Sequence, residues 1–155
     1  MSEIDRTRYG DFSKSIHGSV SPETRLPISG SIEVTHRCNL ACAHCYNNLP
    51  AGDREAAANE LSLAEHRRIL DELEQAGTLW LLYTGGEIFA RADFLKIYRY
   101  AKERGFLITL FTNGTAIDES KADFLAEWRS FAVEITLYGH SRKTFERLTG
   151  VPGSF

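Results

Sequence analysis

The chain has 155 residues, a formal net charge of −3, 43% apolar residues and 25% charged residues, which is ordinary for one globular domain with a buried core. A weakly acidic chain has no long-range attraction for nucleic acid or an anionic membrane, so neither partner is expected. No apolar run approaches the ~20 residues that cross a bilayer, and the charged first residues are unlike a signal peptide, so we expect a cytoplasmic protein.

The beginning of the chain divides into an arm and the start of a folded core. Residues 1–30 mix charged residues with Ser, Gly and Pro and have no sustained period, which predicts a surface arm. From residue 31 to residue 37 the two-residue period of a strand appears, with Ile32, Val34 and His36 on one face. The core domain is therefore expected to span residues 31–155.

All the cysteines of the chain follow this strand, as Cys38, Cys42 and Cys45. Thiolates select iron–sulfur clusters, zinc or copper(I). A structural zinc ion takes four protein ligands, whereas a cluster held by three cysteines leaves one iron open to another ligand. A lone cysteine is most often a small buried hydrophobe, but three at this spacing and none elsewhere favour a metal or cluster site.

The remainder alternates between helical and strand patterns. Residues 47–59 contain turn signals and predict a connector, after which Ser62 and Glu65 form a capping box for a helix that stops at Gly77. Further elements follow in order: a buried strand over 79–83, a helix from an Asp93 cap to Gly105, a strand over 106–111, a turn at 112–114, a helix that begins at Asp118, and a strand over 131–138.

This order predicts an α/β fold with a parallel sheet built from right-handed βαβ units. The cysteines then lie where a strand ends, which is where parallel α/β folds place their chemistry. No helix is predicted after Gly139. Ser154 is a possible helix N-cap, but no helical segment follows it. The last strand would therefore present an open edge.

Two motifs resemble the radical S-adenosylmethionine (radical SAM) superfamily over residues 32–155: Cys38-x-x-x-Cys42-x-x-Cys45 followed by Tyr46, and Gly85-Gly86-Glu87. The resemblance implies a partial parallel (βα) barrel of about three and a half βα units, truncated after the fourth strand. It also implies a 4Fe-4S cluster on the three cysteines. S-adenosylmethionine would bind the open iron and be cleaved reductively to a 5′-deoxyadenosyl radical that abstracts hydrogen from a substrate.

The resemblance also implies roles for residues near the cysteines. Gly85 and Gly86 would offer carbonyls to the amino group of S-adenosylmethionine, and Glu87 would brace the turn or add negative charge. Ile88 replaces the proline commonly found there, which should soften the loop. His44 would lie against the adenine, or is simply a solvated loop residue. Thr136 would hold the cosubstrate, or is an ordinary β-favouring residue.

Asn113 matches the Thr-Asn-Gly segment of the family at the end of the third strand. A role in the turn is at least as strong an interpretation as cofactor binding, because Asn before Gly is strong turn chemistry.

The segments 137–139 and 149–155 resemble the branch of the superfamily that carries a cysteine-rich C-terminal extension, absent here, and modifies peptides. The implied partners are a peptide or small-molecule substrate and an electron donor such as a flavodoxin or ferredoxin. Two other interpretations stay open. One is a structural zinc module in which His36 or His44 is the fourth ligand. The other is a catalytically inert remnant of the core.

Overall fold

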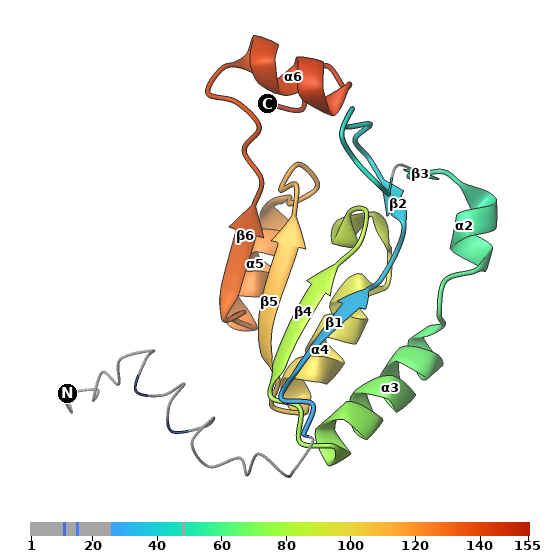
Figure 1. Cartoon of the computed structure of the whole chain (residues 1–155), viewed down its shortest axis with the longest axis vertical. Coiled ribbons are helices and arrows are strands. Elements are labelled where there is room, and N and C mark those ends of the chain that lie inside the picture. The colour runs from blue at the N-terminus through green and yellow to red at the C-terminus, as the bar shows by residue number, and fades with distance from the viewer. Residues whose placement is uncertain (1–10, 12–14, 16–25, 48) are drawn as a thin grey trace.

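A four-stranded parallel sheet forms the centre of the computed structural model, which describes residues 11, 15, 26–47 and 49–155. The strands lie in the order β1-β4-β5-β6 (Figure 1). Their bounds are Ser29–Glu33 for β1, Trp80–Thr84 for β4, Leu107–Thr112 for β5 and Ala132–Ile135 for β6. The predicted α/β class and parallel sheet are confirmed, and every carboxyl end lies at the same edge of the sheet.

The helices between the strands supply the core. Helix α3 spans Leu63–Gln75, α4 spans Phe94–Glu103 and α5 spans Glu119–Glu127. Buried residues of β4, β5 and α4 form one continuous cluster, which includes Leu81, Tyr83, Ile97, Tyr98, Ile108 and Leu110. Burial of this apolar surface stabilises the sheet, so the cysteine segment at its carboxyl edge is attached to a rigid, closely packed core.

Short sequence motifs predicted most of the helix ends correctly. The Ser62–Glu65 capping box is present, and Asp118 caps α5 by accepting from the Lys121 amide at 2.9 Å. Gly77 and Gly105 adopt the left-handed conformation expected after α3 and α4. Asp93 is the residue before α4 but makes no side-chain cap, because its carboxylate binds the Arg91 guanidinium instead.

Two predicted strands are shorter than the sequence period suggests. The strand expected over residues 31–37 is split into β1 and β2 (Arg37–Cys38), and β2 pairs with β3 (Leu49–Pro50) in a separate small sheet. The strand expected over 131–138 ends at Ile135, because its neighbour β5 ends at the paired residue Thr112. Pairing partners, rather than side-chain alternation, therefore limit both strands.

Besides β3, three short helical elements in the described part of the chain lie outside the predicted set. Helix α2 (Arg54–Ala58) occupies part of the expected connector, the 3₁₀ turn η1 (Ile88–Ala90) follows Glu87, and α6 (Arg142–Thr149) lies beyond the strand ends next to the cysteine segment (Figure 1). The predicted arm lies mostly outside the described residues. No helix in the described part of the chain has the length and apolar character needed to cross a bilayer.

Candidate functional site: a cysteine loop facing a glycine edge

The cysteine loop, residues 38–47, begins at the end of β2 and lies at the carboxyl edge of the sheet. A tight turn closes it, in which the Cys45 amide donates to the Cys42 carbonyl at 3.0 Å. The amides of Leu40 and Asn47 each donate to a cysteine sulfur, Cys38 and Cys45 respectively, at 3.4 Å. Amide donors directed at sulfur stabilise a thiolate, so the loop backbone is arranged for sulfur ligands that carry negative charge.

The three thiols are close enough to repel one another as charges. Burial raises the pKa of Cys38, with a smaller contribution from the charges of Glu87 and Cys45. Burial also raises the pKa of Cys42, and the charges of Cys38 and Cys45 raise it further. Deprotonation of Cys38 and Cys42 is therefore favoured by a nearby positive centre.

The donor set fits an iron–sulfur cluster better than a single ion. Among the described residues, no three His, Cys, Asp or Glu side chains converge closely enough to hold one metal ion. His36 pairs with Glu33 at 3.2 Å, and the ring of His44 packs edge-on against Tyr138 with centroids 4.7 Å apart. Both histidines thus have partners other than the thiols, and three cysteines without a fourth protein ligand suit a cluster with one open iron better than a closed four-ligand zinc site.

Gly85 and Gly86 follow β4 and lie against the backbone of residues 35–37. A Cβ at Gly85 would stand 2.2 Å from the Thr35 carbonyl oxygen, and one at Gly86 would stand 2.3 Å from the Arg37 oxygen. The amides of Gly86 and Glu87 donate to those same two oxygens at 2.8 and 2.9 Å. Close approach of two backbones thus requires glycine at both positions.

The carbonyl oxygens of Gly85 and Gly86, which together we call the glycine edge, differ from the bonded amides beside them. Within the described residues, neither the Gly85 nor the Gly86 oxygen accepts a hydrogen bond from another part of the chain. Two carbonyls without internal donors form an acceptor surface suited to an ammonium group. The prediction that they bind the cosubstrate therefore stays a prediction with compatible geometry.

Glu87 is fully buried and its carboxylate is directed into the protein. Oε1 accepts from the Phe89 amide at 3.1 Å and from the Thr112 hydroxyl at 2.7 Å, and Oε2 accepts from the Asn113 amide at 2.8 Å. The side chain therefore joins the loop after β4 to the end of β5. Of the two roles expected for Glu87, these contacts favour bracing.

Asn113 lies between the end of β5 and the cysteine loop. Its amide group donates to the Asn39 side chain at 2.9 Å and to the Cys38 sulfur at 3.7 Å, and its carbonyl oxygen accepts from the Thr115 amide at 2.9 Å. One side chain thus combines the turn role with a contact to Cys38, a predicted cluster ligand. Its contact with the cosubstrate stays a prediction.

The other two predicted cofactor residues have different surroundings. His44 is exposed in the cysteine loop and touches Tyr138. Thr136 follows β6 directly and is exposed at the same edge of the sheet. Tyr138 connects the two residues, because its ring packs against His44 and its hydroxyl group interacts with the Thr136 side chain. Contact of either residue with the cosubstrate stays a prediction.

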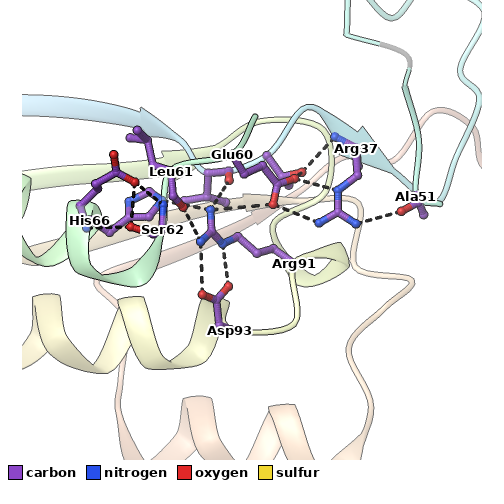
Figure 2. A network of polar contacts seen from close by, with 11 residues as sticks. Arg37, Ala51, Glu60, Leu61, Ser62, His66, Arg91 and Asp93 are labelled. Atoms are coloured by element: carbon purple, nitrogen blue, oxygen red, sulfur yellow. Dashed lines mark hydrogen bonds and ion pairs between the residues drawn. The ribbon is translucent and has the colours of Figure 1, made fainter. Parts of the chain in front are cut away.

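A network of buried and partly buried charges supports the residue that precedes Cys38 (Figure 2). The Arg37 guanidinium donates to the two oxygens of Glu60 at 2.7 and 3.1 Å and to the Ala51 carbonyl at 2.9 Å. Burial raises the pKa of Glu60, but hydrogen bonds from Arg37 and Thr35 outweigh it and hold the pKa below its ordinary value. A bidentate pair of this kind restrains Arg37 strongly.

Arg91 extends the network toward α3. It donates to the Val34 and Leu61 carbonyls at 3.1 and 2.7 Å and binds Asp93 at 2.7 Å (Figure 2). Its Nη1 also lies 3.2 Å from Nε2 of the buried His66. Because a guanidinium only donates, that nitrogen accepts and the imidazole is neutral. Sequence reasoning missed this network, since charged residues in a connector give no periodic signal.

A cavity of about 400 Å³ opens beside the network, with Glu33, Asp53, Asn59, Glu60 and His66 in its wall. Neither the cysteines nor the glycine edge contribute to that wall as described. The cavity is therefore separate from the site built by the cysteine loop.

Residues 32–155 match the family model of the radical SAM superfamily. The chain is 33% identical over 136 residues to the PqqA peptide cyclase of Rhodopseudomonas palustris, covering 88% of this chain and 35% of that relative. It is 36% identical over 153 residues to the Fe-coproporphyrin III synthase of Methanosarcina barkeri, covering 97% of this chain and 37% of that relative. The chain thus spans little more than a third of these relatives.

The fold also matches a solved structure. The crystal structure of Streptococcus suis SuiB bound to S-adenosylmethionine superposes with a TM-score of 0.68 and 24% sequence identity, over 91% of this chain and 31% of SuiB. At that identity the match shows the shared fold alone. Together with the family match, it confirms the partial radical SAM core that the resemblance of the two motifs implied.

Proposed function

The chain belongs to the radical SAM superfamily, and from that premise we propose that it forms the cluster- and cosubstrate-binding part of an enzyme that modifies a peptide or protein. Cys38, Cys42 and Cys45 would hold a 4Fe-4S cluster. When bound, that cluster supplies the electron that cleaves S-adenosylmethionine to a 5′-deoxyadenosyl radical, which abstracts a substrate hydrogen atom. The observation that carries the proposal is the acceptor edge of Gly85 and Gly86 beside a loop of three free thiols.

The residues of the chain have separable tasks in this proposal. The carbonyls of Gly85 and Gly86 accept from the cosubstrate ammonium, and they are positioned because their neighbouring amides are held by residues 35–37. Asn113 orients the Cys38 sulfur through its amide group. Glu87 keeps the loop after β4 and the end of β5 at a fixed separation, since its carboxylate bonds to both. His44 and Thr136 would contact the nucleoside part.

A peptide substrate is supported by the names of several relatives. They include PqqA peptide cyclases and the subtilosin biosynthesis protein AlbA of Bacillus subtilis, and SuiB has been solved with its precursor peptide. The Fe-coproporphyrin III synthase shows that relatives of similar identity carry names outside the peptide class. An external reductant protein such as a flavodoxin or ferredoxin, and the reducing environment of the cytoplasm, complete the proposal.

Anaerobic reconstitution with iron and sulfide tests the cluster assignment. We expect iron and sulfide to bind with broad visible absorption, and the electron paramagnetic resonance spectrum of the reduced protein to change when S-adenosylmethionine is added. Cys42→Ser should abolish the signal, because two thiolates do not replace three as ligands. Stoichiometric zinc without colour would contradict the proposal. Formation of 5′-deoxyadenosine with dithionite as reductant then tests turnover.

A further inference from the structure

Helix α6 and the turn that follows it, residues 142–155, lie next to the cysteine loop (Figure 1). The amide of Ala41 donates to the Thr149 carbonyl at 2.8 Å, and the amide of Ala43 donates to the Leu148 carbonyl at 3.0 Å. Both acceptors belong to the last turn of α6, where a helix leaves its final carbonyls without partners of its own. The loop therefore completes the helix, and the helix restrains the loop.

The two restrained amides stand on either side of Cys42. Two hydrogen bonds of this spacing fix the backbone around the middle cysteine, which is buried. Gly150 closes the contact: a Cβ there would lie 2.9 Å from the Ala41 carbonyl oxygen and 3.4 Å from the Ala41 Cβ. Gly150 also ends α6 in the left-handed conformation, with φ of 70°.

The turn after the helix is itself rigid. The Thr149 and Ser154 hydroxyls are 2.8 Å apart, and Ser154 donates to the Val151 carbonyl at 2.7 Å. The Gly153 amide donates to Glu146 at 2.8 Å, which ties the turn back to the helix. Ser154 is thus buried inside a turn instead of serving as the free N-cap that the sequence suggested.

Aromatic side chains join this segment to the same loop. Phe145 is buried between Tyr138 and Phe155, with ring centroids 6.0 and 5.6 Å away, and Tyr138 in turn packs on His44. The segment from Tyr138 to Phe155 therefore contacts the cysteine loop through its backbone at Ala41 and Ala43 and through one side chain at His44.

We propose that residues 142–155 act as a clamp that positions the cysteine loop, and that Gly150 is its positioning residue because only glycine permits the α6 carbonyls to reach the amides beside Cys42. The importance of this for cluster binding rests on the proposed function. The restraint on the loop does not, so it can be measured in protein that contains no metal.

Gly153 offers a matched control for Gly150. Both glycines have positive φ, 70° and 80°, so alanine is strained by the backbone at either place. A Cβ at Gly153 would meet no atom within 4 Å, whereas one at Gly150 would press on Ala41. The difference between Gly150→Ala and Gly153→Ala therefore isolates the contact with the loop from the strain of the turn.

Amide hydrogen exchange of the full, metal-free chain measures the restraint directly. In Gly150→Ala we expect the amides of Ala41 and Ala43 to exchange on the order of tenfold faster than in Gly153→Ala, as for loss of a hydrogen bond. After anaerobic reconstitution, iron should also leave Gly150→Ala faster when a chelator is added, and the spectrum of the reduced cluster should change. Equal exchange and equal chelator rates in the two variants would overturn the proposal.

Asparagine variants cover the case in which Gly150→Ala does not fold. Asparagine tolerates positive φ better than alanine, so Gly150→Asn and Gly153→Asn keep the steric difference with less strain. If both Gly150 variants are unfolded while both Gly153 variants are folded, the contact stabilises the whole domain. That result would overturn a specific role in positioning the loop.

Discussion

Replacement of Glu87 by glutamine tests whether the buried carboxylate is a brace. The change keeps the shape of the side chain and removes its charge and one of its two acceptor oxygens. The carboxylate now accepts from two backbone amides, Phe89 and Asn113, on different oxygens. A glutamine amide can face only one of them with oxygen, and its NH₂ group must then face the other amide. Either orientation leaves two buried donors opposed.

The cost follows from those contacts. Hydrogen bonds to a charged group contribute about 1.5–3 kcal/mol each, and an unpaired buried polar group costs about 1–3 kcal/mol. Because one contact is lost and the rest become neutral, we expect Glu87→Gln to lower the free energy of unfolding by roughly 3 kcal/mol. For a domain of this size that is a fall in Tm of about 6–12 °C.

Urea unfolding followed by circular dichroism measures the effect, with Glu103→Gln on the exposed side of α4 as the control. The control should stay within about 0.5 kcal/mol of the wild type. At a temperature where Glu87→Gln is folded, reconstituted protein should bind S-adenosylmethionine nearly as well as the wild type, because a brace makes no direct contact. A wild-type free energy of unfolding, or folded protein with abolished cosubstrate binding, would refute the reasoning.

Three more predictions concern the glycine edge and the charge network around Arg37 and Arg91. Gly86→Ala should lower the free energy of unfolding by about 1–3 kcal/mol, because its methyl group would overlap the Arg37 oxygen; urea unfolding should leave Gly52→Ala, whose Cβ meets nothing within 4 Å, unchanged. The pKa of Glu60 is lowered from 4.5 by its hydrogen bonds, against the opposing effect of burial. The ionised carboxylate therefore stabilises the fold fully above pH 4.5, and this stabilisation is lost as the pH falls through the lower pKa of the folded protein. The free energy of unfolding, measured against pH, should fall less steeply in acid for Glu60→Gln than for the wild type. Burial, and then the charge of Arg91, lowers the pKa of His66 from 6.5. The unfolded chain therefore binds the proton first, so the free energy of unfolding should fall as the pH drops below 6.5. His66→Gln should reduce this slope, and an unchanged slope would count against a neutral buried ring.

Elements with local signals were predictable from the sequence. The capping box at Ser62, the glycine stop at Gly77 and the apolar run over 79–83 each combine several signals in a few residues. The candidate metal ligands were equally direct to locate, because cysteines that share one loop are visible as a short motif. The strand ends were less accurate, since they depend on where a neighbouring strand stops.

The supports of the site were not predictable in the same way. Arg37 and Glu60 pair across a connector, and a charged residue read alone is expected at the surface. Helix α6 did have a cap at Ser141 and a stop at Gly150, but Phe145 and Leu148 alone make a weak apolar stripe. Its position on the cysteine loop depends on two backbone hydrogen bonds, which no pattern of side chains encodes.

The glycine edge offers backbone carbonyl oxygens and the cysteine loop offers backbone amides, so the two sides of the site suit groups of opposite charge. At the glycine edge the amides of Gly86 and Glu87 are bonded within the protein, and the carbonyl oxygens of Gly85 and Gly86 are the acceptors that we propose for a cation. In the cysteine loop the amides of Leu40 and Asn47 face sulfur, so N–H dipoles meet an anionic centre. A molecule that carries an ammonium group and also bonds to metal is complementary to both sides at once. The amides of Ala41 and Ala43 donate to carbonyls of α6 instead, so the amides on either side of Cys42 are engaged by the fold and not by sulfur.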